Sequence, residues 1–253
     1  MKWTEIPSGQ TNGAFQRFMV ALGENADTAV TRINTEPAFA DRMASYAMNG
    51  GVESSASQTR AREIMGKNFF GIEEAIKHFG VNPSRRQIAA LGEVPFSEDV
   101  LTACKDTHVL VAVFPISIVD IRNIVKKLPD QTLFYNQDWY DDEAFANDKG
   151  ETGWQLVRKA PIANSTGKTW NEQQALLSQD EETPKAQVMV YTIIGVFLAT
   201  GERLFEKVYV RCVDLDSIGD RVYVGRFVGG GLGVDGWGDD GRNDGIGVSA
   251  VGK

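Results

Sequence analysis

Two short stretches of the sequence combine residue types that bind ions in other proteins. The first, Ser165-Thr-Gly-Lys-Thr169, matches the end of a phosphate-binding loop, in which backbone N–H groups and a lysine hold phosphate oxygens. The complete loop also needs a glycine five residues before Gly167, but Ile162 occupies that position. Without the full glycine turn the backbone cannot wrap around a phosphate, so we expect a loop that leads into a helix at Thr169 and Trp170.

The second stretch, Asp214-Leu-Asp-Ser-Ile-Gly-Asp220, begins like a calcium-binding loop, with carboxylates at alternate positions and a glycine turn. Ile218 stands at the third ligand position, and Gly225 stands where a bidentate glutamate would close the site. We therefore expect an acidic turn between two strands, with weak cation binding as the alternative.

Residues able to act as nucleophiles, bases or metal ligands lie far apart in the sequence. His78 and His108 have no partner at metal-binding spacing, and Cys104 and Cys212 lie in apolar surroundings typical of packed free thiols. One charge-rich segment could supply paired carboxylates for acid–base catalysis, although such segments are usually solvated loops: Asp138, Asp141, Asp142 and Glu143. The sequence therefore predicts no catalytic site, no metal site and no cofactor.

The composition is that of a soluble globular protein. The 253 residues are 42% hydrophobic and 24% charged, with a net charge of −8 and no basic stripe, which argues against nucleic acid as a partner. The longest apolar run, residues 186–200, is interrupted by polar residues and is shorter than a membrane span requires. Since no signal peptide is evident, we expect a cytoplasmic protein or one packaged into a virion or similar particle.

Helical patterns dominate residues 1–103, with apolar residues at helical spacing and glycine or proline near the segment ends. The expected helices cover residues 38–48, 57–65, 71–79 and 83–91, with a further turn that begins at Ser97. The pattern changes near residue 104, where a Val-rich run at residues 108–114 predicts a strand buried on both faces. We therefore place a domain boundary between residues 103 and 104.

Residues 104–253 mix strands with helices in an order that does not follow regular βαβ alternation, which favours an α+β fold over a doubly wound sheet. We expect helices at residues 117–125, 168–177 and 186–204, and a helical turn at residues 142–146. The expected strands after 108–114 are 132–135, 153–158, 208–213, 221–227 and 246–250. Two of these helices would be embedded in a small, mostly antiparallel sheet.

The C-terminal stretch from Gly225 to Lys253 is the most informative part of the chain. It holds 11 of the 26 glycines, a content typical of linkers, because ordering glycine costs the most conformational entropy. Apolar residues nevertheless recur through it at intervals: Phe227, Leu232, Val234, Trp237, Ile246 and Val248. Regular apolar anchors between small polar or glycine positions predict a folded scaffold that presents a surface.

From about Cys104 onward the chain resembles the variable proteins of diversity-generating retroelements, which carry a C-type-lectin-like domain. The similar stretches are residues 153–159, 164–170, 186–195 and 198–205, and the ending Trp237-Gly-Asp-Asp-Gly-Arg-Asn-Asp-Gly-Ile-Gly-Val-Ser-Ala250 is similar to that family's hallmark. In that family an error-prone reverse transcriptase substitutes at template adenines, which turns Asn codons into Gly, Asp, Ser or Tyr codons. The resemblance thus implies a non-enzymatic protein whose C-terminal surface is diversified to bind varied macromolecular ligands, with proteins expected as targets.

The resemblance also implies which positions vary and which are fixed. The expected variable positions are Tyr223, Arg226, Val228, Gly229, Gly233, Asp235, Gly236, Gly238, Asp240, Gly241, Asn243 and Gly245. The expected fixed scaffold is Phe227, Leu232, Trp237, Arg242, Ile246 and Gly247, of which Trp237 would be partly exposed within the binding face because its glycine neighbours cannot shield it. We call the variable positions and Trp237 together the predicted contact positions.

Two other functions are compatible with the sequence. A formylglycine-generating type of enzyme has the same scaffold, but that chemistry would need metal-binding cysteines, and Cys104 and Cys212 are isolated in sequence. The other alternative is a structural or oligomerisation module with a glycine-rich surface strand.

Overall fold

The computed structural model describes residues 8–48, 51–128 and 132–252, which form two compact units, Met1–Glu53 and Ser54–Lys253. The expected boundary at residue 103 falls inside the second unit. The reason is a short strand, β1 (Phe69–Phe70), which pairs in parallel with β2 (His108–Val113) and joins residues 54–103 to the sheet. A two-residue strand leaves no periodic signal in a sequence, so the domain prediction missed this connection.

The first unit is helical, as the sequence predicts. It consists of α1 (Ser8–Leu22), a 3-10 turn (Gly23–Asn25), α2 (Ala26–Thr35) and α3 (Pro37–Met48). No side chain described in these helices is buried. Gly50, expected to end the last helix, lies outside the described residues.

The second unit is a mixed α+β fold with two sheets, where the sequence predicts one. The first sheet has the strand order β1-β2-β3-β9-β4, in which β3 is Gly153–Arg158, β4 is Glu181–Glu182 and β9 is Val251–Gly252. The second has the order β7-β6-β5-β8, in which β5 is Tyr209–Leu215, β6 is Arg221–Val228, β7 is Gly231–Trp237 and β8 is Ile246–Val248. Pairs β1–β2 and β5–β8 are parallel, and the others are antiparallel.

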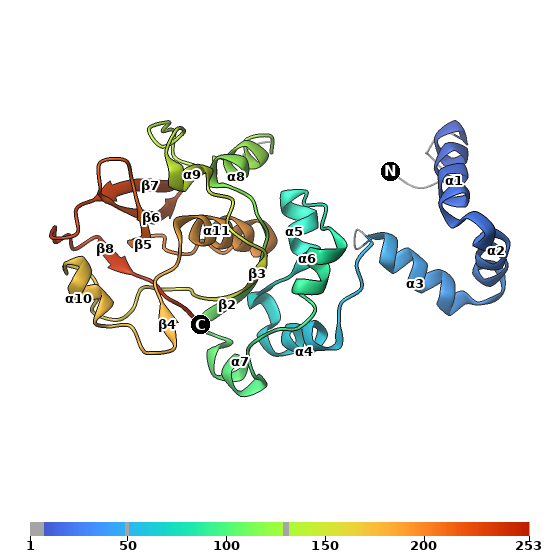
Figure 1. The fold of residues 1–253 in the computed structure, drawn as a ribbon, viewed down its shortest axis with the longest axis horizontal. Helices are drawn as coiled ribbons and strands as arrows, with labels where there is room; N and C mark the ends of the chain where they lie inside the picture. The colour runs from blue at the N-terminus through green and yellow to red at the C-terminus, as the bar shows by residue number, and fades with distance from the viewer. Residues whose placement is uncertain (1–7, 49–50, 129–131, 253) are drawn as a thin grey trace. The chain divides into compact units, whose positions relative to one another are not determined.

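Helix α11 (Ala186–Thr200) lies between the two sheets and is the centre of the core (Figure 1). It begins after Pro184, as predicted, but ends at Thr200 rather than near Leu204, because Gly201 adopts the left-handed conformation that terminates helices. Tyr191, fully buried, donates a hydrogen bond to the carbonyl of Ala112 in β2 at 3.1 Å. No helix among the described residues is long and apolar enough to cross a bilayer.

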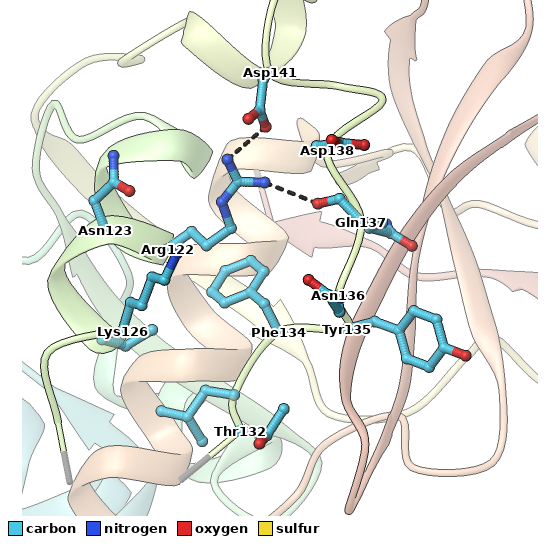
Figure 2. Close-up of a pocket in the computed structure, with 12 residues that line it drawn as sticks. Arg122, Asn123, Lys126, Thr132, Phe134, Tyr135, Asn136, Gln137, Asp138 and Asp141 are labelled. Atoms are coloured by element: carbon cyan, nitrogen blue, oxygen red, sulfur yellow. Dashed lines mark hydrogen bonds and ion pairs between the residues drawn. The ribbon is translucent and has the colours of Figure 1, made fainter.

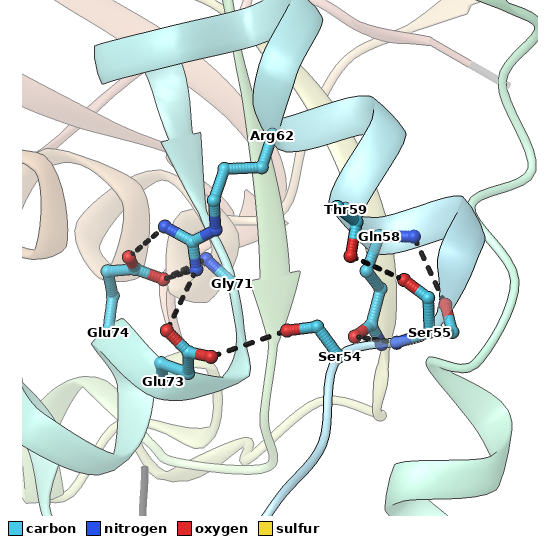
Figure 3. Close-up of polar contacts among 8 residues, drawn as sticks. All are labelled: Ser54, Ser55, Gln58, Thr59, Arg62, Gly71, Glu73 and Glu74. Atoms are coloured by element: carbon cyan, nitrogen blue, oxygen red, sulfur yellow. Dashed lines mark hydrogen bonds and ion pairs between the residues drawn. The ribbon is translucent and has the colours of Figure 1, made fainter. Parts of the chain in front are cut away.

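Residues 54–104 also form four helices: α4 (Ala56–Met65), α5 (Ile72–Phe79), α6 (Arg85–Ala90) and α7 (Glu98–Cys104). Helices α4 and α5 contact β1, and α7 packs against α4. A capping box opens α4, where the Ser55 hydroxyl accepts from the Gln58 N–H and the Gln58 side chain accepts from the Ser55 N–H (Figure 3). Arg62 then binds Glu74 through both guanidinium Nη atoms, at 2.5 and 3.0 Å, which ties α4 to α5 (Figure 3).

Three shorter helices complete the unit: α8 (Ile118–Val125), α9 (Ala144–Asn147) and α10 (Trp170–Gln174). Ser117 caps α8 and Thr169 caps α10, so these helices begin within two residues of the expected starts at 117 and 168, although α10 ends at Gln174 and not at 177. The expected strand at residues 132–135 is reduced to one parallel bridge between Phe134 and Leu232. Strand β7 was not predicted, because its alternating pattern is diluted by Gly231, Gly233 and Gly236.

Two glycines set the geometry of the β6–β7 hairpin. Gly225 has φ +147°, and a Cβ added there would lie 2.3 Å from the carbonyl oxygen of Val208. Gly231 has φ +103°, and its added Cβ would lie 2.3 Å from the carbonyl carbon of Phe134. In both cases the obstacle is backbone, which cannot rotate aside as a side chain can.

We expect Gly225→Ala to lower the free energy of unfolding by at least about 2 kcal/mol, because backbone strain adds to the clash with Val208. Urea unfolding followed by circular dichroism measures the change. Gly229→Ala is the matched control, since its added Cβ meets no atom within 4 Å, and we expect a change within about 0.5 kcal/mol. Equal stability of the two variants would contradict the conclusion that the Val208 backbone excludes a side chain at Gly225.

Candidate ligand-binding face

The two faces of the four-stranded sheet differ because side chains alternate along each strand. Val222 and Val224 of β6 are fully buried, and Val224 stands opposite Val210 of β5 and Val234 of β7. These valines form the inner face, which packs against α11. The outer face carries the residues between them: Tyr209, Arg211, Arg221, Tyr223, Gly225, Gly233, Asp235 and Trp237.

Two tyrosines fill the middle of the outer face. The rings of Tyr209 and Tyr223 meet edge to face, with centroids 4.8 Å apart. Tyr209 also covers Gly233, whose added Cβ would lie 2.8 Å from the tyrosine hydroxyl. Burial, followed by the carboxylate of Asp235, raises the pKa of Tyr223 above its usual range, so the phenol stays protonated.

A buried arginine on the outer face holds the loop of residues 238–245. Arg211 is fully buried, and its Nη2 donates to the carbonyls of Gly238 and Gly241 at 3.1 and 2.7 Å. Its Nη1 donates to the Lys168 carbonyl and to Gln173 Oε1, while its Nε has no partner among the described residues. Arg211 is not among the residues predicted from the sequence, although a charged residue inside the alternating stretch of residues 208–213 is a visible signal.

The same loop is attached to the segment that resembles a phosphate loop. The N–H of Gly167 donates to the Asn243 carbonyl, and the N–H of Trp170 donates to the Asp239 carbonyl. Arg221 stacks 4.1 Å from the Trp170 ring centroid while it binds both carboxylate oxygens of Asp239. Residues 165–169 therefore form the loop that precedes α10, as predicted.

A pair at the surface completes this attachment. Arg242 donates to Glu172 Oε1 at 2.7 Å, and this hydrogen bond lowers the pKa of Glu172 to about 2. Glu172 also accepts from the N–H of Thr169, so one carboxylate both begins α10 and binds the loop. Arg242 is one of the residues expected to be fixed, and its hydrogen bond to Glu172 is a structural reason for that expectation.

The segment 132–141 runs along the exposed edge of β7. The N–H of Tyr135 donates to the Leu232 carbonyl and the N–H of Leu232 donates to the Leu133 carbonyl, both at 3.0 Å. Trp139 Nε1 and the side-chain amide of Gln137 both donate to the Val234 carbonyl. The side chains of Tyr135 and Trp139 are exposed beside the hairpin, which places two aromatic residues next to the predicted contact positions.

The predicted contact positions fall into three groups around this frame. Tyr223, Gly233, Asp235 and Trp237 lie on the outer face, Arg226, Val228 and Gly229 lie at the hairpin turn, and Gly238, Asp240, Gly241, Asn243 and Gly245 lie in the loop. Gly236 is the exception, because it stands opposite Val222 on the other face and lies beside Asp216. Tyr223 and Gly233 are buried, because Tyr209 covers both.

Several carboxylates of the segments 138–143 and 214–220 are hydrogen-bonded within the protein. Asp216 Oδ1 accepts from the N–H groups of Ile218 and Asp220, which forms the turn between β5 and β6, and Asp214 accepts from the Ala186 N–H at the start of α11. The expected acidic turn is therefore confirmed. In the segment considered for paired catalytic carboxylates, Glu143 accepts hydrogen bonds from Ser217, and Asp141 accepts one from Arg122.

A cavity of about 450 Å³ opens between α8 and the segment 132–141 (Figure 2). Arg122 crosses it and donates to Asp141 and to the Gln137 carbonyl, while Tyr135 points away from it toward the hairpin (Figure 2). The Arg122 guanidinium is already paired with Asp141, so it is not free to bind a ligand in this cavity.

The two thiols lack the properties of reactive groups. Burial raises the pKa of the Cys212 thiol well above its usual value, and burial also raises that of Cys104. Both therefore remain protonated at neutral pH, whereas metal ligation and nucleophilic attack need the thiolate. Within the described parts of the chain, no three His, Cys, Asp or Glu side chains gather to form a potential metal site.

We expect Arg211→Met to lower the free energy of unfolding by about 3 kcal/mol, because four acceptors lose a charged donor at once. The loop of residues 238–245 loses two of those bonds, so its amides should exchange with deuterium faster than those of β2. Arg242→Met removes a surface ion pair from the same loop and should change the melting temperature much less. Similar losses in both variants would show that Arg211 has no special role in holding the loop.

No protein-family model, no curated protein and no solved structure matches the chain. The resemblance to retroelement variable proteins therefore stays a prediction.

Proposed function

We propose that this protein is a diversified ligand-binding protein, and that its binding surface is the outer face together with the hairpin turn and the loop 238–245. Residues 104–253 would then form a C-type-lectin-like domain, and the ligand would be another protein. The observation that carries the proposal is that every glycine among the predicted contact positions has a backbone conformation open to L-residues and no backbone atom that would block a side chain.

The glycines among the predicted contact positions can accept side chains. None of these glycines has a positive φ, so their backbone conformations suit L-residues. They are Gly229, Gly233, Gly236, Gly238, Gly241 and Gly245. Where an added Cβ would be crowded, the nearest atom belongs to a side chain, such as the Tyr209 hydroxyl at Gly233 or the Trp237 indole at Gly241. Gly225 and Gly231, which are not among these positions, are blocked by backbone atoms.

Arg226 is a restricted position within this set. Its φ is +44°, in the left-handed region that Asn, Asp and Gly occupy more readily than other residues. Adenine-directed changes to an Asn codon can produce Asp and Gly codons. Mutation of such a codon can therefore supply residues that tolerate the left-handed backbone at position 226. We expect the range of tolerated residues to be narrower at Arg226 than at Gly229.

The size and chemistry of the surface favour a protein ligand. A seven-residue strand such as β7 is about 20 Å long, so the hairpin turn and the loop at its two ends span a distance typical of protein interfaces. Exposed aromatic residues, Tyr135, Trp139 and Trp237, lie along this length, and aromatic side chains are enriched in interface cores. Asp235 and Asp240 are exposed and form no ion pair in the described structure, which favours a partner with basic residues.

The two alternatives receive less support. An enzyme of the formylglycine-generating type would need Cys104 or Cys212 as thiolates, and the burial of both raises their pKa. A structural or oligomerisation module would explain the exposed apolar residues, but it would not explain why crowding at the expected variable glycines comes from side chains alone.

We expect a variant with tyrosine at Val228, Gly229, Gly238 and Asp240 to fold like the parent, with a melting temperature lower by no more than about 4 °C. All four positions have exposed or half-exposed backbone with room for side chains. Gly247→Tyr is the control, because Gly247 is buried and its added Cβ would lie 2.7 Å from Ser165 Oγ. Unfolding of the fourfold variant would contradict the proposal.

The binding function is tested with a display library that randomises the exposed predicted contact positions and is selected against several unrelated proteins. We expect specific binders, and more of them than from a library of equal size at Arg85, Arg86 and Glu93, which are exposed on or after α6. Equal yields from the two libraries would contradict the proposed role of the face.

Diversification itself predicts a near-identical repeat beside the gene, with mismatches confined to adenines. Mismatches at all four bases would refute the diversification.

A further inference from the structure

Tyr209 lies across a row of glycines on the outer face. In the strand register it stands beside Gly225 of β6, and Gly225 stands beside Gly233 of β7. Because neither glycine has a side chain, the tyrosine ring crosses Gly225 and reaches Gly233 with its hydroxyl. Gly233 is one of the predicted contact positions, whereas Tyr209 is not.

The same ring covers Tyr223. The two rings meet edge to face with centroids 4.8 Å apart, and only 9% of Tyr223 is exposed. The guanidinium of Arg226 lies over the Tyr209 ring, 5.9 Å from its centroid. One half-buried ring therefore conceals Gly233 and most of a second tyrosine.

A side chain at position 233 does not fit beneath this ring. A Cβ added to Gly233 would lie 2.8 Å from the Tyr209 hydroxyl oxygen and 2.9 Å from Cε1 of the ring, closer than Cβ atoms approach their neighbours in proteins. The three atoms nearest to that Cβ all belong to the Tyr209 side chain, and the φ of Gly233 is not positive. The obstacle to substitution is therefore the ring and not the backbone.

The strand cannot yield in place of the ring. Strand β7 pairs with β6 at Gly233 itself. On its other edge the Leu232 carbonyl accepts from the N–H of Tyr135, and the Val234 carbonyl accepts from Trp139 Nε1. The ring is freer to move, since a tyrosine in a strand has two common χ1 rotamers and this one is partly exposed.

We propose that Tyr209 is a further specificity-determining residue of the binding face, and that the residue at position 233 controls its orientation. With glycine at 233 the ring stays over the glycine row, and the face presents little tyrosine. A side chain at 233 turns the ring outward and uncovers Tyr223, so that two tyrosines can contact a partner. Tyrosine supplies large, rigid contact area in binding sites. The role in binding rests on the proposed function, but the movement of the ring does not.

The movement is tested by nitration of the full chain with tetranitromethane, with each modified tyrosine identified by mass spectrometry. In Gly233→Ser we expect Tyr223 to be nitrated several-fold faster than in the parent, because its cover has moved. Gly229→Ser is the matched control, since its added Cβ meets no atom within 4 Å, and it should leave the rate at Tyr223 unchanged.

Two fully buried tyrosines of the core, Tyr140 and Tyr191, report on unfolding. Both should stay unmodified in Gly233→Ser. An unchanged rate at Tyr223 would overturn the proposal. Nitration of Tyr140 and Tyr191 together with Tyr223 would also overturn it, because the substitution would then unfold the chain and not move one ring.

A double-mutant cycle tests whether Tyr209 transmits the effect. Tyr209→Ala should uncover Tyr223 while glycine remains at 233, and adding Gly233→Ser to this variant should have no further effect. A further increase as large as that in the parent would show that position 233 acts without Tyr209, against the proposal.

Binding measurements connect the movement with the proposed function. When the display library also randomises position 233, Tyr209→Ala should weaken binders that carry a side chain at 233 more than binders that keep Gly233. Equal weakening of the two groups would refute the role of Tyr209 in specificity. A library that yields no binders would refute the proposed function and leave the nitration result intact, so the two failures are distinguishable.

Discussion

A helix without a polar face is stable in water only when apolar surface surrounds it, and α11 is such a helix. The side chains from Ala186 to Val196 are buried almost without interruption, so elements must pack against it from every side. Sheet β1-β2-β3 covers one side and sheet β7-β6-β5 another, while α5 and α8 occupy the remainder (Figure 1). The two sheets in the second unit are a consequence of that requirement.

Packing against α11 uses only one face of the four-stranded sheet, which leaves the outer face free of the core. Val210, Val222, Val224 and Val234 are buried on the inner face, whereas Arg211 and Tyr223 are buried on the outer face by the loop and by Tyr209. The outer face then needs its own support, and Arg211 provides it by binding loop carbonyls instead of packing apolar surface. Hydrogen bonds to backbone carbonyls depend on the course of the chain and not on side-chain identity, so they survive substitution in the loop.

The sequence predicts elements well where one residue pattern decides them. The helices expected to begin at 117 and 168 begin at Ile118 and Trp170, and the Val-rich run in β2 is buried at all six positions. Prediction fails where contacts distant in sequence decide the structure. Strand β7 exists because Gly233 and Asp235 pair with β6, although their residue types disfavour strands. The burial of Tyr223 could not be predicted for the same reason, since it depends on where the Tyr209 ring lies.

A glycine-rich surface can be ordered because its conformation is imposed by neighbours, but glycine gives little binding energy to a partner. In this chain many of the predicted contact positions have no side chain, so under the proposed function the contact area would have to come from residues outside the variable set. Tyr135 and Trp139, attached to the edge of β7, and Trp237 at its end are exposed and large. A shared set of fixed aromatic residues would supply general affinity, while the positions between them adjust which partner fits. Under that division of roles, truncating Tyr135 should weaken the binding of every selected partner, and changing Gly229 should weaken only some.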